Sequence, residues 1–182
     1  MANAIGMVEF TSIARGIYAA DQMVKVSEVE IATASSVCPG KYIAIVYGDV
    51  ASVENSVSVG EKEAGEFWVD SIIIPNVSPQ VFPAITGSTM PDRVQALGIV
   101  ESFSLSTMVI AADAILKAAE LQPIELRLGN GLGGKAYFTF TGDVAAVETG
   151  VQAGTALLEA KGLLVNAEVI PSPSELLIAS LF

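Results

Sequence analysis

The sequence predicts an α/β (α+β) protein built from two consecutive copies of one β-α-β-β-α-β unit. Two observations support this prediction. A set of short motifs returns roughly 90 residues later, and in each half the spacing of apolar residues changes between that of strands and that of helices. The chain of 182 residues therefore divides into two units, which we place at residues 1–90 and 91–182.

Five short motifs of the first half return in the second half, in the same order and with nearly the same spacing. The most complete is AIGMVE at residues 4–9, which returns as ALGIVE at 96–101. The others are AAD at 19–21 and 111–113, GKY at 40–42 and GKA at 134–136, GDV at 48–50 and 142–144, and IIP at 73–75 and VIP at 169–171. Chance rarely produces such an ordered set, so the chain is expected to be a duplicated unit.

Each half begins with an apolar strand, at residues 4–10 in the first half. Thr11 and Ser12 follow as candidates for the N-cap of a helix. The apolar residues of this helix fall on one stripe, as in an amphipathic helix. The stripe consists of Ile13, Ile17, Ala20 and Val24 in the first half and, after Ser104, of Leu105, Val109, Ala112 and Leu116 in the second.

For the rest of each unit, the sequence predicts a short strand, a loop, a more strongly apolar strand, a second helix and a last strand. The more strongly apolar strand lies at residues 42–47 and is matched by 136–140, and Gly48 and Asp49 open the second helix. A proline ends the last strand because proline cannot donate to the ladder. This is the order of a split β-α-β, ferredoxin-like unit. The segment 83–95, rich in proline and small polar residues, is expected to be the linker.

Composition excludes several classes of function. The net charge of -11 argues against nucleic acid, whose binding depends on Lys and Arg, and against an anionic membrane surface. The chain has no histidine, so it offers no Ser-His-Asp or Cys-His pair, and we do not expect an enzyme. Cys38 is the single cysteine and no signal or spanning segment is visible, so we expect a cytoplasmic protein. The hydrophobic fraction of 52% suggests burial between subunits.

The repeated motifs, taken together, resemble the BMC domain of bacterial microcompartment shells, and the resemblance covers both halves. Two such domains in one chain resemble the tandem class, which implies a pseudo-hexameric homotrimer that tiles with other shell proteins. Lys25 and Lys117 match the lysine that lies at the tile edge in this family. From the residues alone, each is equally an i,i+4 partner of Asp21 or Asp113.

The two halves differ most in the loop that faces the central axis in this family. These pore-loop residues are Ser35, Ser36, Val37, Cys38, Pro39 and Gly40 in the first half, and Gly131, Leu132 and Gly133 in the second. The offset between the repeats matches Cys38 with Leu132. The runs at residues 11–14 and 37–41 resemble one subgroup of the family, the type-T shell proteins of propanediol utilisation.

The subgroup resemblance implies a [4Fe-4S] cluster at the pore centre, one per trimer, bound by Cys38 of each subunit. Such a cluster would transfer electrons across the shell, or be delivered to enclosed redox enzymes. The residues alone leave other readings of Cys38 open. A lone cysteine is most often a small buried apolar residue, and zinc is a weaker rival because structural zinc takes four ligands. Without a metal at Cys38, the protein would be a pore for small metabolites or a purely structural tile.

Overall fold

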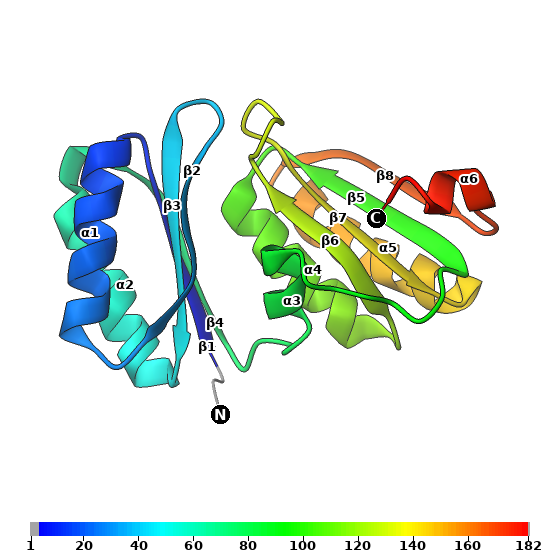
Figure 1. Ribbon diagram of the computed structural model, residues 1–182, viewed down its shortest axis with the longest axis horizontal. Coiled ribbons are helices and arrows are strands. Elements are labelled where there is room, and N and C mark those ends of the chain that lie inside the picture. The colour runs from blue at the N-terminus through cyan, green and yellow to red at the C-terminus, as the bar shows by residue number, and fades with distance from the viewer. Residues whose placement is uncertain (1–3, 182) are drawn as a thin grey trace. The chain divides into compact units, whose positions relative to one another are not determined.

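The computed structural model describes residues 4–181, which form two compact units. The first comprises the residues up to Val77 together with Gly129–Gly133. The second comprises Ser78–Leu128 together with the residues from Gly134 onward. The units thus divide after Val77, and the segment around residue 90 groups with the second unit. Each unit contains the predicted β-α-β-β-α-β order (Figure 1).

The first unit consists of one four-stranded antiparallel sheet and two helices. Its elements are β1 (Ala4–Phe10), α1 (Ile13–Val26), β2 (Glu30–Val37), β3 (Lys41–Gly48), α2 (Val50–Ala64) and β4 (Trp68–Pro75), with the short 3-10 helix η1 (Gly65–Phe67) before β4. The strand order is β2-β3-β1-β4, so β1 is one of the two inner strands and is hydrogen-bonded to β3 and β4. Both helices lie on the same side of this sheet (Figure 1).

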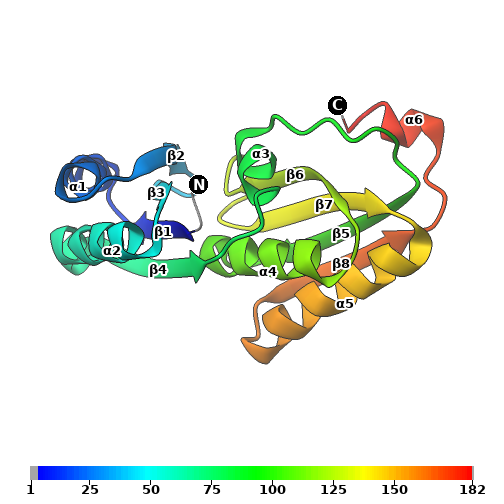
Figure 2. The same ribbon diagram turned by 90° about the horizontal axis from the view of Figure 1, so that it is seen from below.

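The second unit repeats this architecture with two additional short helices. Its elements are α3 (Val81–Thr86), β5 (Ala96–Ser102), α4 (Leu105–Ala118), β6 (Gln122–Leu128), β7 (Ala136–Gly142), α5 (Val144–Ala160), β8 (Leu164–Ile170) and α6 (Glu175–Ile178). The strand order β6-β7-β5-β8 matches that of the first sheet. Figure 2 shows α4 and α5 together beneath this sheet.

The helices begin where the repeat predicts. Ser12 caps α1 by accepting a hydrogen bond from the Arg15 amide at 3.2 Å, and Ser104 caps α4 in the same way. Asp49 and Asp143 cap α2 and α5. A side-chain oxygen at the N-cap satisfies an amide that has no partner within the helix. Both copies therefore begin their helices by the same local interaction.

The predicted linker at residues 83–95 is wrong in its first part. Residues up to Thr86 belong to α3, which packs against α4 and β6. Gly87, in the left-handed conformation at φ 67°, ends this helix. Pro83 is tolerated because it lies in the first turn, where its missing N–H has no helical partner.

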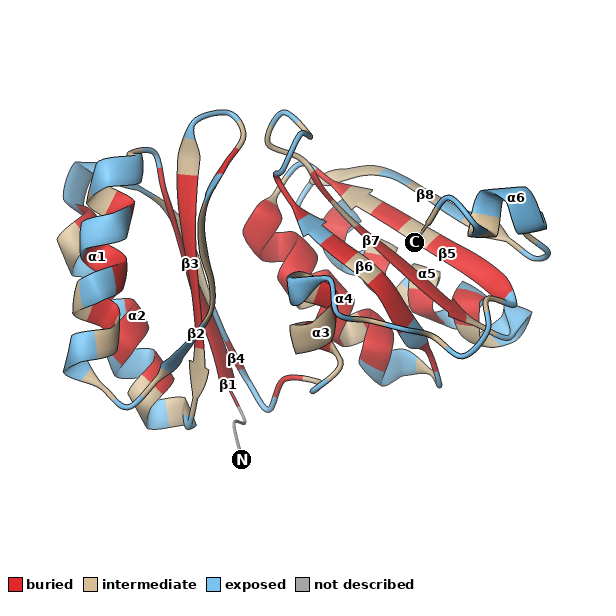
Figure 3. Ribbon diagram, in the orientation of Figure 1, coloured by how far each residue is buried: buried red, intermediate tan, exposed pale blue. Residues whose placement is uncertain are grey.

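The predicted apolar stripe of the first helix matches its buried face only in part, because Ala20 is buried and Val24 packs against the core. Ile13 and Ile17 are exposed, at 41% and 54%, while α1 buries Gly16 and Ala19, among others, against the sheet. In α4 the predicted stripe is buried, from Leu105 at 1% onward. Figure 3 shows this difference, with α1 partly exposed and α4 largely buried.

Candidate functional site

The strands β2 and β3 form a hairpin that is closed by three residues, Cys38, Pro39 and Gly40. The last residues paired across this hairpin are Val37 and Lys41. Gly40 has φ 75°, a left-handed conformation that favours glycine, so it allows so short a connection. The hairpin therefore presents Cys38 at its tip.

Three residues that were predicted in the first loop lie in the strand that leads to it. Ser35, Ser36 and Val37 are the last residues of β2. Val37 is buried, Ser36 is exposed and Ser35 lies between these extremes. Only Cys38, Pro39 and Gly40 of the predicted set form the turn itself.

The corresponding loop of the second half is longer and has a different conformation. It runs from Gly129 to Lys135, between β6 and β7, and contains the predicted residues Gly131, Leu132 and Gly133. Its glycines have positive φ angles, including 73° at Gly131 and 62° at Gly133. Leu132 is matched with Cys38 by sequence offset, but it lies in the middle of a larger loop. The residues Gly129–Gly133 group with the first compact unit, where the Cys38 amide donates a hydrogen bond to the Gly129 carbonyl at 3.2 Å.

Cys38 has a free thiol and is partly exposed. Within residues 4–181, no group of three His, Cys, Asp or Glu side chains could hold a metal ion. One chain therefore supplies one thiolate, and an iron–sulfur cluster would need further sulfur ligands from other copies of the chain. A free, partly exposed thiol at the tip of a turn is suited to bind a cluster together with the same thiol of other copies of the chain.

An ion pair lies at the base of each loop. Lys41, the residue after the first turn, donates to Glu9 with Nζ and Oε1 2.7 Å apart. Lys135, the last residue of the second loop, pairs with Glu101 in the same way. Glu9 is only 3% exposed although it is charged. Sequence reasoning missed these residues, and the signal for them is that Glu and Lys recur at matching positions in both copies.

A model of the BMC domain matches residues 4–77 and 96–173. The chain belongs to the BMC-domain family. It is 39% identical over 175 residues to the bacterial microcompartment shell protein PduT of Citrobacter freundii, with 96% of this chain and 95% of that protein covered. The shell protein EutM of Escherichia coli K12 is 36% identical over 81 residues, which are 44% of this chain and 80% of EutM.

A solved structure agrees with this assignment. A microcompartments protein from Desulfitobacterium hafniense DCB has a TM-score of 0.94 and 46% identity, covering 98% of this chain and 99% of that one. The predicted resemblance to the BMC family is therefore confirmed. The chain is a structural shell protein with two BMC domains, and it is part of the microcompartment shell in the cytoplasm. No helix within the described part of the chain is both long and apolar enough to cross a membrane.

The two lysines matched to the tile edge of BMC shell proteins both form ion pairs within their own helix. Lys25 contacts Asp21, and Lys117 contacts Asp113, each at 2.6 Å. The first pair is exposed, whereas the Asp113 side chain is only 9% exposed. The i,i+4 reading is therefore confirmed for both lysines, and a role in contact with neighbouring tiles stays a prediction.

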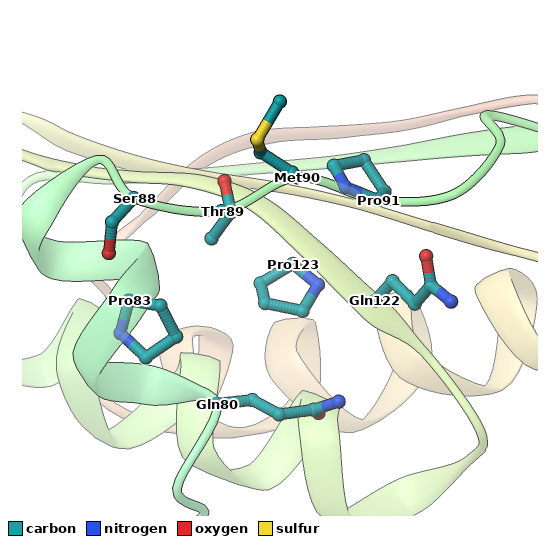
Figure 4. A pocket seen from close by; sticks show the side chains of 8 residues that line it. All are labelled: Gln80, Pro83, Ser88, Thr89, Met90, Pro91, Gln122 and Pro123. Carbon is teal, nitrogen blue, oxygen red and sulfur yellow. The ribbon is translucent and has the colours of Figure 1, made fainter.

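A hollow of about 310 Å³ lies in the second unit, between the segment after α3 and the start of β6 (Figure 4). Its walls combine prolines, amides and hydroxyls, and Met90 stands at its rim, 93% exposed. Thr89 already donates to the Ile124 carbonyl, and Gln122 already accepts from the Asp92 amide. None of the predicted site residues lines the hollow.

Proposed function

We propose that three copies of the chain form a shell tile with a [4Fe-4S] cluster at its centre, bound by Cys38 of each subunit. The observation that carries this proposal is the placement of the single cysteine of the chain, free and partly exposed, at the tip of a three-residue turn. The similarity to PduT over nearly the whole chain supports assigning the protein to the same kind of tile.

Self-association is supported by the unequal burial of equivalent residues on α1 and α4. Ile13 and Ile17 are exposed, whereas their counterparts Leu105 and Val109 are buried, at 1% and 0%. Tyr18, also on α1, is 48% exposed. Large apolar side chains gathered on one helix face mark a protein contact more often than a free surface. We assign this face to contact with another copy of the chain.

The number of ligands is consistent with a trimer. Each chain supplies one thiolate, so three chains hold three corners of a cluster that ordinarily takes four thiolates. The fourth iron is left to water or another small ligand. When bound, such a cluster supplies one-electron transfer. The protein would then pass electrons across the shell, or deliver the cluster to enclosed redox enzymes, rather than act as an enzyme itself.

The alternative function is a metal-free pore tile that passes small metabolites. The observation that favours it is the second loop, where several glycines leave backbone groups uncovered by side chains. Exposed backbone N–H and C=O groups can bind a small polar solute. In this function, the Cys38 thiol would not bind iron.

An anaerobic purification tests the proposal. Iron, acid-labile sulfide and electron paramagnetic resonance are measured for the wild type, Cys38→Ala and the matched loop variant Leu132→Ala, and native mass spectrometry reports the oligomeric state. We expect about four irons per three chains in the wild type and in Leu132→Ala, and none in a still trimeric Cys38→Ala. A reconstituted wild type without iron would instead support the metal-free pore.

We also propose that Lys25 lies at the contact between neighbouring tiles, as the family resemblance implies. Its ion pair with Asp21 is exposed and is therefore weak enough to exchange for a partner on another tile. Lys25→Ala is expected to prevent formation of extended sheets, seen by electron microscopy, while single tiles persist. Lys62→Ala, also at an exposed lysine of the first domain, is the control and should still form sheets. Sheets formed equally by Lys25→Ala would contradict the assignment, and Lys117→Ala tests the second edge.

A further inference from the structure

We propose that Glu9 and Lys41 are positioning residues that hold the Cys38 turn in place. The effect of this positioning on cluster binding rests on the proposed function. The positioning itself is a property of the single chain. The pair joins β1, an inner strand of the first sheet, to the first residue after the turn, with 2.7 Å between Nζ of Lys41 and Oε1 of Glu9.

The register of the strands shows what this contact adds to the hydrogen bond between the Cys38 amide and the Gly129 carbonyl. The pairing of β1 with β3 ends at Phe10 and Tyr42, so Lys41 lies one residue beyond the last pair. Lys41 pairs only with Val37, across the hairpin itself. The side-chain bond to Glu9 therefore ties the base of the turn to β1, which is itself held by strands on both sides.

The contact between Glu9 and Lys41 is a cross-strand contact on one face of the sheet. Glu9 lies opposite Ile43, and Lys41 is two residues before Ile43 on the same strand. Residues two apart on a strand face the same side of the sheet, so the pair is a diagonal cross-strand contact. Both side chains lie on the face opposite to the one on which Phe10 and Tyr42 join the core with the helices.

Burial makes the pair obligatory rather than incidental. The Glu9 side chain is 4% exposed and that of Lys41 is 29% exposed. A carboxylate removed from water is costly unless a cation is bound to it, so the native fold requires Lys41 to remain at this position. The turn is thus held at a fixed place relative to the sheet, which is what a ligand shared among chains requires.

The second half provides a comparison because it carries the same pair beside a loop without sulfur, and that loop touches the Cys38 turn through the Gly129 carbonyl, which accepts from the Cys38 amide. Lys135 contacts Glu101, but the Glu101 side chain is 29% exposed, against 4% for Glu9. The loop that precedes Lys135 is also longer than the Cys38 turn. The second pair is therefore the less buried of the two and lies beside the longer loop.

The test compares two double variants that remove both charges while keeping the side-chain volumes similar. The first is Glu9→Gln with Lys41→Met, and the matched control is Glu101→Gln with Lys135→Met. The metal-free proteins are alkylated with iodoacetamide, a neutral reagent, under native conditions, and the rate is divided by the rate in denaturant. Thermal unfolding followed by circular dichroism confirms that each variant is folded.

We expect Cys38 to be alkylated at least several-fold faster in the Glu9/Lys41 variant, and at a rate much closer to that of the wild type in the Glu101/Lys135 variant, which reaches Cys38 only through the Gly129 contact. The single variant Lys41→Arg, which keeps both Glu9 and a cation at residue 41, should be alkylated as slowly as the wild type. With the cluster bound, the Glu9/Lys41 variant should lose iron to a chelator faster than the control. A folded Glu9/Lys41 variant with wild-type alkylation would overturn the inference. A wild type that binds no iron would defeat the proposed function, while the alkylation ratio would still decide the positioning role.

Discussion

The carboxylate of Asp113 accepts a hydrogen bond from the backbone amide of Ser78, with 2.7 Å between Oδ1 and N. Its other oxygen binds Lys117, so both oxygens are used. Asp21, the equivalent residue of the first BMC domain, contacts Lys25 and Gln22 in an exposed position. The two copies of one motif therefore have different structural roles, since Asp113 anchors the start of the segment that leads to α3.

Asp113→Ala is expected to lower the free energy of unfolding by about 1–3 kcal/mol, because it removes the partner of a half-buried amide. Asp21→Ala, the matched variant, should lower it by only about 0.3–0.5 kcal/mol, the value of an exposed i,i+4 pair. Urea unfolding followed by circular dichroism measures both. Equal losses in the two variants would show that the bond to Ser78 adds nothing.

Gly16 allows α1 to pack directly on Tyr42, because a Cβ at residue 16 would lie 2.6 Å from the tyrosine ring. The second domain has Met108 and Ala136 at the equivalent positions, both fully buried, so a large and a small residue have exchanged places. Gly16→Met should therefore destabilise the fold by about 1–3 kcal/mol through overpacking. Adding Tyr42→Ala should recover much of this loss, and thermal unfolding of the single and double variants measures the recovery. A double variant no more stable than Gly16→Met would argue against compensation at this contact.

The exposed face of α1 predicts a variant that is folded but does not associate. Ile17→Glu places a charge where we assign contact with another copy, and burying an unpaired charge is costly. The variant should elute as a monomer in size-exclusion chromatography with light scattering, with an unchanged circular dichroism spectrum. Leu176→Glu is the control, because Leu176 is 88% exposed on α6 and lies outside this face. A trimeric Ile17→Glu would remove α1 from the subunit contact.

Tyr137 is expected to titrate well above an ordinary tyrosine. Burial, and then the hydrogen bond to Glu125, raise the pKa of Tyr137 to about 12. Because the folded state retains a proton that the unfolded state loses from about pH 10, this residue stabilises the fold below pH 10, and the contribution disappears as the pH rises toward 12. The difference in ultraviolet titration between the wild type and Tyr137→Phe isolates this group. A midpoint near 10 in that difference would contradict the prediction.

The order of strands and helices could be predicted because the repeat supplies the same evidence twice. Hydrophobic periodicity and capping residues such as Ser12 and Asp49 are local signals, and the structure uses them in both copies. The short helix α3 was missed because Pro83 and the small residues after it are also typical of a linker. Local composition cannot separate a six-residue helix from a turn-rich connection.

The burial of α1 could not be predicted from periodicity alone. Ile13, Ile17 and Ala20 fall on one apolar stripe, but only Ala20 of these three is buried. The helix also buries Gly16 and Ala19, whose small size allows close approach to the sheet. A stripe of large apolar residues indicates that a surface will be covered, not which partner covers it. In the same way, Cys38 could be placed in a turn from its Pro-Gly neighbours, whereas its fixation by Glu9 depends on strand register.

The two hairpins of the chain end in loops of different length, a three-residue turn at Cys38 and a longer, glycine-rich loop around Leu132. In evolutionary terms, joining two copies in one gene gives each loop its own codons. In a protein with one domain per chain, every substitution in the loop is inherited by all loops of the assembly at once. Here the loop of one domain can acquire a reactive side chain while the loop of the other domain remains rich in glycine. Every assembly of this chain therefore contains the two kinds of loop in equal number.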